Sequence, residues 1–378
     1  MRKIGIFLFL LLLPYSVFAE DFLPNAESGL LMEFSTGKVV FEKEKDKEVS
    51  VASMTKMVAQ IIILEEIRSK KIKWDDIVTV SQNASSMGGS QIYLETGEKM
   101  SVEDLMKGIS VASGNDATVA MAEYISGTEE KFVERMNQKV KKLGLKHTHF
   151  QNCTGLDEEN HYSSSYDMAV IARELLMKYP EILRFSSIYE DYLRKDTERK
   201  FWLVNTNKLV SQYEGADGLK TGHTDDAGYC LAATVQRGNL RLIAITLGEK
   251  NSKVRNQETM NLLDYGFQSI KMKTLKKKGS IVKNVSFSKT DPKRIFYILK
   301  DDLNVIESPN KKNMYTYNVK LRKLSFPIKK GDVLGVIQAK NGNKVISSAS
   351  LISSEDVRKL SFLELFFDSI KGVLFGSF

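Results

Sequence analysis

The chain contains little cysteine, and this limits the disulfide chemistry available to it. Only two cysteines, Cys153 and Cys230, occur among 378 residues. Dense disulfide frameworks belong to small secreted domains that lack a sufficient core, and this chain is far larger than those. We therefore expect two buried free thiols. A single bridge stays open at this point, because the sequence does not give the distance between the two residues.

Histidine is also scarce, and glycine-rich loops that bind dinucleotides or phosphates are absent. The four histidines are His147, His149, His161 and His223, and their spacing matches no common metal site. We interpret the first three as structural. The sequence therefore predicts neither a metal ion nor a cofactor.

The N-terminal residues have the composition of an export signal. Arg2 and Lys3 precede an apolar run from Ile4 to Leu13, and Val17-Phe18-Ala19 supplies small residues for a cleavage site. This order is typical of a secretory signal peptide, and it favours one over a core helix. We predict a signal peptide over residues 1–19. The mature protein should then act in the periplasm or at the outer face of the cytoplasmic membrane.

Length and charge divide the rest of the chain. A chain of 378 residues is too long for one ordinary core, so two domains are expected. Residues 20–267 carry 31 Lys and Arg against 38 Asp and Glu, whereas residues 268–350 carry 19 against 5. For an exported protein, the basic region suits anionic lipid headgroups or envelope polymers better than nucleic acid. A merely solvated basic face is the alternative.

Hydrophobic periodicity predicts a mixed α/β domain over residues 20–270. Two short apolar segments at 29–34 and 38–41, joined by the turn Ser35-Thr36-Gly37, predict a hairpin, and two longer strands at 228–235 and 240–247 predict another. Apolar residues at three- and four-residue steps predict helices. The expected helices cover residues 53–71, 102–110, 116–142 with a break at Gly127, 165–178 and 253–270.

The C-terminal part differs in composition. Short β-rich segments separated by Asp, Asn and Gly turns predict a small all-β domain over residues 271–350. Residues 351–378 end in an amphipathic pattern, with the polar residues from Ser361 onward on one narrow arc of a helical wheel. This segment is a poor membrane span but suits a helix in the headgroup plane. A helix docked on the protein's own β domain is the alternative.

The segment Val51-Ala52-Ser53-Met54-Thr55-Lys56 leads from an extended stretch into a long helical pattern. A serine three residues ahead of a lysine at a helix start places both side chains on one face of the first turn. An uncharged lysine amine there can take the serine proton and turn a weak alcohol into a nucleophile. This pattern predicts a serine acyl-transfer enzyme.

Two later tripeptides, Ser113-Gly114-Asn115 and Lys220-Thr221-Gly222, complete the pattern. Each motif alone is weak, and Ser-x-x-Lys recurs at Ser280 and Ser308 in contexts typical of a surface. All three motifs occur in order on a helix start, a loop and a strand, and this makes the set much more specific than each motif alone. We therefore take the three motifs together as one candidate site.

The set resembles penicillin-binding proteins and class A β-lactamases, which carry Ser-x-x-Lys, Ser-Asp-Asn and Lys-Thr-Gly. Here Ser-Gly-Asn departs from the second motif but keeps both polar side chains. Longer segments make the chain similar to the low-molecular-mass penicillin-binding proteins that are D-alanyl-D-alanine carboxypeptidases. These segments are Ala52-Ser53-Met54-Thr55-Lys56, Ser113-Gly114-Asn115-Asp116-Ala117, Asn160-His161-Tyr162-Ser163 and Asp217-Gly218-Leu219-Lys220-Thr221-Gly222-His223-Thr224.

The resemblance extends from about Ser28 to the C-terminal helix, and it implies a fold and an activity. The fold is an antiparallel sheet flanked by helices, with a helical lobe, followed by a small β domain and a tail helix. The activity is removal of the terminal D-alanine from peptidoglycan stem pentapeptides. β-Lactams are implied as covalent inhibitors, and no nucleic acid partner is expected.

Residue roles follow from the resemblance by matching position. Ser53 would attack the carbonyl between the two D-alanines, and Lys56 would accept its proton. Ser113 would relay protons, and Asn115 would hold either Lys56 or the substrate amide. The remaining positions would bind substrate: Lys220 and Thr221 at the terminal carboxylate, Gly222 allowing close approach, His223 through its N–H beside that of Ser53, and Arg255 at the carboxylate.

Physical chemistry sets one condition on this arrangement. Lys56 acts as a base near neutral pH only if burial or a neighbouring cation lowers its pKa. We expect Lys220, across the cleft, to supply the second effect. For Arg255, the alternative to binding the substrate carboxylate is a solvated arginine on a helix face.

Three other functions stay open on sequence alone. A β-lactamase shares the nucleophile but hydrolyses its acyl-enzyme quickly, often through a dedicated glutamate. A D,D-endopeptidase would cut cross-links with the same chemistry. An inactive wall-binding scaffold would keep the fold, and the intact motifs argue against it.

Overall fold

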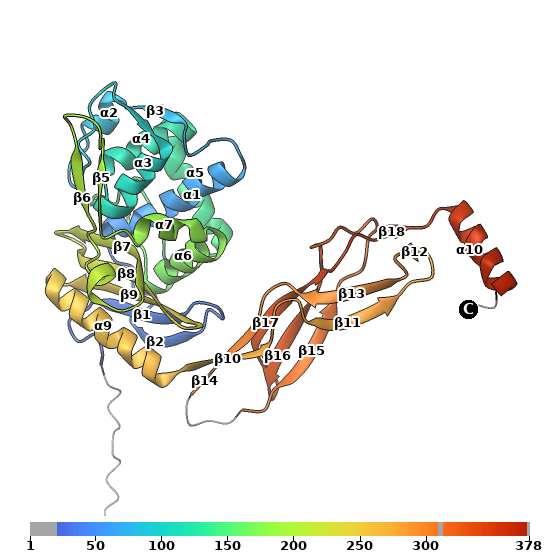
Figure 1. Ribbon diagram of the computed structural model, residues 1–378. Coiled ribbons are helices and arrows are strands. Elements are labelled where there is room, and N and C mark those ends of the chain that lie inside the picture. Colours follow the sequence, from blue (N-terminus) through green and yellow to red (C-terminus); the bar gives the residue numbers. More distant parts are fainter. Residues whose placement is uncertain (1–20, 309–312, 376–378) are drawn as a thin grey trace, which may run out of the picture.

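The computed structural model describes residues 21–308 and 313–375 (Figure 1). The predicted signal peptide lies outside these residues. An α/β domain runs from Asp21 to the end of a long helix at Ser269, and a β-rich domain begins at Lys271. A short helix follows at the C-terminal end (Figure 1). The predicted fold class is therefore confirmed.

A five-stranded antiparallel sheet forms the centre of the α/β domain, in the order β2-β1-β9-β8-β7. Alternate side chains enter two different cores, as the two-residue period of a strand requires. On β1, Leu30 and Met32 pack into the core of the helical lobe, whereas Leu31 packs under α9. The strands are β1 Ser28–Glu33, β2 Val39–Lys43, β7 Ala216–Thr224, β8 Gly228–Arg237 and β9 Leu240–Glu249.

Helices cover both faces of this sheet. The helix α9, Ser252–Ser269, packs on β8 and β9, and α6, Ser165–Lys178, packs on β1 and β9 from the other side (Figure 1). Both have side-chain N-caps, because Asn251 Oδ1 accepts from Val254 N and Ser164 Oγ accepts from Asp167 N. The predicted hairpins and these two helices are thus present.

The helical lobe fills the interval between β2 and β7. Its central helix is α1, Lys56–Arg68, which is buried on nearly every side. The predicted break at Gly127 separates α4 from α5. The other elements are η1 Ala52–Thr55, β3 Ile77–Thr79, α2 Gln82–Ser85, β4 Lys99–Ser101, α3 Val102–Lys107, η2 Gly108–Ala112, α4 Asn115–Ser126, α5 Glu129–Leu143, η3 Pro180–Ile182, α7 Leu183–Ser186, β5 Glu190–Leu193, β6 Phe201–Val204 and α8 Leu209–Gln212.

Two predicted helices differ at their ends. The helix predicted from Ser53 begins as a 3-10 turn, η1, and becomes α-helical only at Lys56. The helix predicted over 102–110 changes to a π-helix, η2, which ends at Ser113. Apolar spacing alone does not distinguish these helix types, so the sequence could not predict either change.

The β-rich domain has its own core. A five-stranded sheet in the order β11-β13-β17-β16-β15 buries Ile295, Tyr297, Ile337 and Leu351. Its strands extend past the predicted limit at residue 350, since β17 ends at Ser353 and β18 at Lys359. The strands are β10 Lys271–Lys276, β11 Ile281–Ser286, β12 Thr290–Asp291, β13 Arg294–Leu299, β14 Leu303–Glu307, β15 Thr316–Leu321, β16 Val333–Asn341, β17 Lys344–Ser353 and β18 Arg358–Lys359.

The start of the tail helix α10, Phe362–Phe375, is tied to the β domain. Ser361 and Glu364 form a capping box, in which the Ser361 N–H donates to Glu364 Oε2 at 2.8 Å. Arg358 donates to both carboxylate oxygens of Glu364. On the same helix, Phe362 is 81% exposed, and Leu363, Phe366 and Phe367 are also exposed. The helix therefore presents apolar side chains to solvent.

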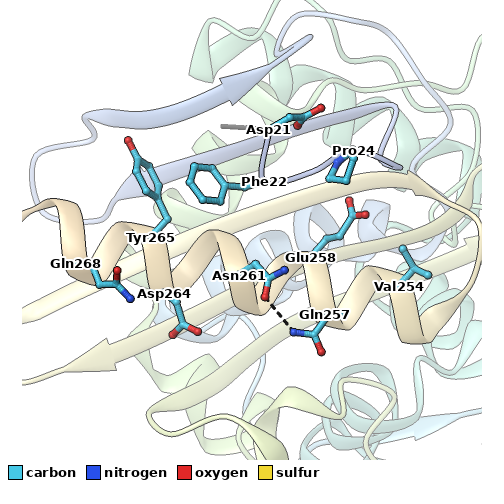
Figure 2. A pocket seen from close by; sticks show the side chains of 10 residues that line it. All are labelled: Asp21, Phe22, Pro24, Val254, Gln257, Glu258, Asn261, Asp264, Tyr265 and Gln268. Carbon is cyan, nitrogen blue, oxygen red and sulfur yellow. Dashed lines mark hydrogen bonds between the residues drawn. The ribbon is translucent and has the colours of Figure 1, made fainter. Parts of the chain in front are cut away.

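The N-terminal segment packs against α9. Phe22 stacks on Tyr265 with 4.3 Å between ring centroids, and Asn25 donates to Glu258. Figure 2 shows a hollow of about 570 Å³ between this segment and the outer face of α9. Carboxylates, amides and aromatic rings line it, and none of its lining residues belongs to the three motifs.

Candidate active site

The predicted nucleophile lies in the 3-10 turn that precedes α1. Lys56 Nζ is 2.6 Å from Ser53 Oγ and 2.6 Å from the carbonyl oxygen of Thr154, to which it donates. Lys56 is fully buried, whereas Ser53 is partly exposed. The structure therefore places the amine behind the hydroxyl, with the hydroxyl facing outward.

Burial lowers the pKa of the Lys56 amine from 10.5 to about 7. Removal from water disfavours the charged form of an amine, and this is the main cause here. Cys153 and Asp116 act in the opposite direction. Burial therefore gives Lys56 the lowered pKa that it needs to act as a base near neutral pH.

The expected repulsion between Lys220 and Lys56 is present. Burial lowers the pKa of Lys220 well below its usual value, and the charges of Lys56 and Arg255 lower it further. For Lys56 itself, burial is the main cause of the lowered pKa.

A loop at residues 153–155 supports the nucleophile turn. Gly155 has a φ of +85°, and a Cβ there would lie 1.9 Å from the carbonyl oxygen of Ala52. Only glycine allows this approach at that backbone conformation. Sequence analysis missed both Thr154 and Gly155, because neither belongs to a motif and both reach the site from about a hundred residues away.

The interpretation of His161 as structural agrees with its contacts. The Gln151 N–H donates to His161 Nδ1, so Nε2 carries the proton and donates to Thr55 Oγ1 at 2.8 Å. Burial lowers the pKa of His161 to about 4, which keeps the ring neutral. The ring thereby fixes the turn that carries Ser53.

Ser113 ends the π-helix η2 with a left-handed backbone, at a φ of 63°. Lys220 Nζ donates to Ser113 Oγ at 2.8 Å and to the carbonyl oxygen of Thr221 at 3.0 Å. Strained backbone and π-helical turns are concentrated at functional sites. The second and third motifs therefore meet directly.

Asn115 does not contact Lys56, which was one of the two partners expected for it. Its Nδ2 donates to the Gly88 carbonyl oxygen at 2.7 Å, and its Oδ1 is buried without a hydrogen-bond partner among the described residues. The Thr154 carbonyl, not Asn115, holds Lys56. The remaining alternative, an acceptor for a substrate amide, suits an unpartnered oxygen.

Gly222 allows a close approach of the nucleophile turn. A Cβ there would lie 2.6 Å from the Val51 carbonyl oxygen and 3.3 Å from Ser53 N. Gly222 also lines the hollow beside Ser53, where substrate is expected to lie close to the strand. Thr221 Oγ1 donates to Thr206 Oγ1 at 2.8 Å, which joins β7 to the segment after β6.

Arg255 is only 4% exposed, so the alternative of a solvated arginine is wrong. Its Nη1 donates to the Cys230 carbonyl oxygen at 3.3 Å, and its Nε and Nη2 donate to Asn256. Burial lowers its pKa, although arginine stays charged. Cys230 and Cys153 are buried free thiols, as expected.

A hollow of about 410 Å³ joins these groups. Ser53, Ser113, Thr221 and Gly222 line it, while Lys56 and Lys220 are buried behind its wall. The His223 ring lies 3.9 Å from that of Tyr229 at one side. Sequence analysis missed the other lining residues, which carry no motif: Ser90, Val204, Asn205, Thr206, Lys208, Tyr229 and Ser252.

Comparison with known proteins agrees with this geometry. Residues 19–251 match the family model described as D-alanyl-D-alanine carboxypeptidase, and residues 271–359 match that of the C-terminal domain of penicillin-binding protein 5. The chain is 45% identical over 341 residues to D-alanyl-D-alanine carboxypeptidase DacF of Bacillus subtilis, covering 90% of this chain and 87% of the relative.

Solved structures are similar over the same range. Penicillin-binding protein 5 of Haemophilus influenzae is 32% identical with a TM-score of 0.72, covering 89% of this chain and 98% of that one. Penicillin-binding protein D2 of Listeria monocytogenes in its ampicillin-bound form is 29% identical with a TM-score of 0.58, covering 64% and 97%. This chain therefore belongs to the D-alanyl-D-alanine carboxypeptidases, a family of serine peptidases.

Proposed function

We propose that this chain hydrolyses the bond between the two terminal D-alanines of peptidoglycan stem pentapeptides, through an acyl-enzyme on Ser53. One observation carries the proposal. The amine of Lys56 lies 2.6 Å from Ser53 Oγ, and burial favours its uncharged form. An uncharged amine at this distance is within reach of the hydroxyl proton.

The reaction would run in two stages. Lys56 takes the proton of Ser53, Oγ bonds to the carbonyl carbon, and the oxyanion binds the N–H groups of Ser53 and His223. The C–N bond then breaks, and the proton passes through Ser113 to the leaving D-alanine. Water attacks the ester in the second stage, and the free carboxylate leaves. The Lys56–Ser53 and Lys220–Ser113 distances, 2.6 and 2.8 Å, support this proton path.

The carboxylate of the leaving D-alanine would bind to cationic and hydroxyl side chains of the hollow. Arg255 and Lys208 line it, as do Thr206 and Thr221, which are hydrogen-bonded to each other. A carboxylate would also favour the charged form of Lys220. The unpartnered Oδ1 of Asn115 would accept from an amide on the acyl side of the substrate. Release of D-alanine from a peptide ending in D-Ala-D-Ala tests the assignment, and no release would contradict it.

β-Lactams should acylate the same serine. The similar protein from Listeria binds ampicillin, and the similarity covers 64% of this chain. Among the described residues, no aspartate or glutamate lines the hollow around Ser53. Rapid deacylation by a β-lactamase often needs a glutamate there. We therefore expect a long-lived penicillin adduct rather than turnover.

Acylation should depend on pH through Lys56. The amine is active when uncharged, and its pKa is about 7, so protonation below that pH removes the base. The second-order rate constant for penicillin acylation should fall about tenfold per pH unit below pH 7 and level off above it. Stopped-flow acylation between pH 5 and 9 measures this. A rate independent of pH over that range would contradict the role of Lys56.

Export and membrane association are also proposed. The signal-like residues 1–19 support export. No helix among the described residues is long and apolar enough to cross a membrane. The exposed phenylalanines of α10, next to a domain of net positive charge, instead support a helix that lies on the membrane surface.

Truncation before Ser361 tests the surface anchor. The shortened protein should leave the membrane fraction and keep full D-alanine release, because α10 follows the β domain and none of its described residues lines the hollow around Ser53. Fractionation of expressing cells and an activity assay on both forms provide the measurement. An unchanged membrane fraction would contradict the anchor.

A further inference from the structure

Exposed aromatic side chains gather on the β5–β6 hairpin at the edge of the helical lobe (Figure 1). Trp202 is 55% exposed and Tyr192 is 39% exposed, and the two are directly paired across the strands. Tyr93 is 63% exposed and contacts Phe201, the neighbour of Trp202, edge to face. We call Trp202, Tyr192 and Tyr93 the aromatic shelf.

The register of the hairpin connects this shelf to the catalytic hollow. Side chains two residues apart on a strand lie on one face, so Trp202 shares its face with Val204. Val204 lines the hollow that contains Ser53. The opposite face of β6 is turned to the core, since Leu203 is fully buried. Trp202 therefore extends the wall of the hollow by about 7 Å along the strand.

The shelf lies away from the residues assigned to the substrate carboxylate. In one direction the chain continues from Val204 to Thr206, whose hydroxyl accepts from that of Thr221. Trp202 lies in the other direction along β6. A substrate whose carboxylate binds beside Thr206 therefore turns its acyl part toward the shelf.

The loop that carries Tyr93 borders the acyl side of the hollow. The carbonyl oxygen of Gly88 accepts from Asn115 Nδ2 at 2.7 Å, and Ser90 lines the hollow. The Oδ1 of Asn115 is the acceptor assigned above to an amide of the acyl part. This loop therefore leads from the acyl-binding residue through Gly88 and Ser90 to the shelf.

The backbone of Tyr93 is strained, although its ring adds little to the core. Its φ is 56°, a conformation that bulky residues rarely adopt and that is concentrated at functional sites. The N–H groups of Ile92 and Leu94 donate to the buried carboxylate of Asp116 and hold the loop in place. The loop is thus fixed in a form that exposes an aromatic ring beside the hollow.

The charges near the shelf favour a neutral ligand. Lys200 Nζ lies 4.1 Å from the Tyr192 ring centroid. Glu190 is exposed and pairs with Val204, so it lies on the same face of the hairpin as Trp202. One cation and one anion give this face no net charge. Large exposed aromatic side chains beside a site are typical of binding surfaces, so the ligand should be neutral and partly apolar.

The acyl part of a peptidoglycan stem has such a group at its far end. Four stem residues precede the scissile bond, and the first of them is joined to an N-acetylated sugar. Four extended residues span up to about 14 Å, enough to lead from the hollow to a ring about 7 Å beyond Val204. The residues next to the sugar are commonly alanine and glutamate, which are small or charged. A sugar ring instead offers a neutral face of C–H groups that can stack on an indole.

We propose that the aromatic shelf binds the N-acetylated sugar that carries the stem peptide, so that this chain prefers stems attached to glycan over free peptides. The inference rests on the proposed function and adds a specificity determinant to it. Trp202 would stack on the sugar ring, with Tyr192 and Tyr93 beside it. Tryptophan and tyrosine are enriched among the residues that dominate binding. The reacting groups stay the same, because the sugar lies four residues from the scissile carbonyl.

The test compares one pentapeptide ending in D-Ala-D-Ala with the same pentapeptide attached to its N-acetylated disaccharide. For wild type, we expect kcat/KM for D-alanine release to be at least tenfold higher with the disaccharide. The double variant Trp202→Ala/Tyr192→Ala should bring the two values within about twofold of each other and leave that of the free peptide nearly unchanged. Trp202→Phe should keep most of the preference, since a flat ring remains.

Tyr317→Ala is the matched control, since Tyr317 is 46% exposed on β15 of the other domain. It should leave the preference intact. Wild type that cleaves both substrates equally well would overturn the inference alone, as would a double variant that keeps the preference. Equal loss with both substrates, at unaltered thermal unfolding, would assign the shelf to the peptide and also overturn it. Wild type that releases D-alanine from neither substrate would overturn the proposed function itself.

Discussion

Ser53→Ala should lower the rate of D-alanine release by about four orders of magnitude or more and abolish penicillin labelling. Removal of a catalytic serine hydroxyl removes the covalent intermediate, and losses of this size are usual in serine hydrolases. The substitution removes one oxygen from a partly exposed side chain, so the fold should remain. Activity with a terminal D-Ala-D-Ala peptide and labelling with fluorescent penicillin provide the measurements.

Ser280→Ala is the control for Ser53→Ala. Ser280 begins another Ser-x-x-Lys sequence, in the turn between β10 and β11 of the second domain. Its substitution should leave both readouts unchanged. Retained activity in Ser53→Ala, with folding confirmed by circular dichroism, would require a different nucleophile and contradict the mechanism.

Gly155→Ala should damage both stability and catalysis. A Cβ at this position would lie 1.9 Å from Ala52 O and 2.3 Å from Ala52 C, so the loop or the nucleophile turn must move. A displacement of about 1 Å at a catalytic group can cost about a hundredfold in rate. We expect a loss of that size in kcat/KM. We also expect a loss of about 1–3 kcal/mol of unfolding free energy beyond any backbone strain.

Gly127→Ala separates the two effects. Gly127 has nearly the same φ, +84°, but a Cβ there meets nothing within 4 Å. Both variants carry the cost of an alanine at positive φ, and only Gly155→Ala carries the clash. Urea unfolding and D-alanine release of the two variants isolate the clash. Equal stability and equal activity would contradict the supporting role of the 153–155 loop.

The sequence predicted the fold where local patterns determine it. The short apolar segments on either side of Ser35-Thr36-Gly37 indicated the hairpin β1–β2, and the hairpin β8–β9 followed from its turn. It did not predict the β5–β6 hairpin. That ribbon has four residues per strand, too few for a periodic signal, and Trp202 faces solvent.

The motifs identified the side chains of the candidate site. Their hydrogen-bond partners come from distant parts of the chain, so only the structure shows them. Lys56 and Ser53 are three residues apart, so local geometry suffices for that pair. The acceptor for Lys56 is a backbone carbonyl at Thr154, 98 residues away, and the partner of Thr221 is Thr206. Every residue has a backbone carbonyl, so the sequence does not show which one accepts a hydrogen bond from Lys56. Burial was one of the two causes expected for a lowered Lys56 pKa, but whether Lys56 is buried is a property of the folded chain.

If the hydroxyl of Ser53 becomes an ester during the reaction, a β-lactam adduct should be found on that residue. The protein is incubated with ampicillin, quenched, digested and analysed by tandem mass spectrometry. We expect a single adduct on the peptide containing Ser53, formed in wild type and absent from Ser53→Ala. An adduct on any other residue, or none in a folded protein that still releases D-alanine, would contradict this expectation.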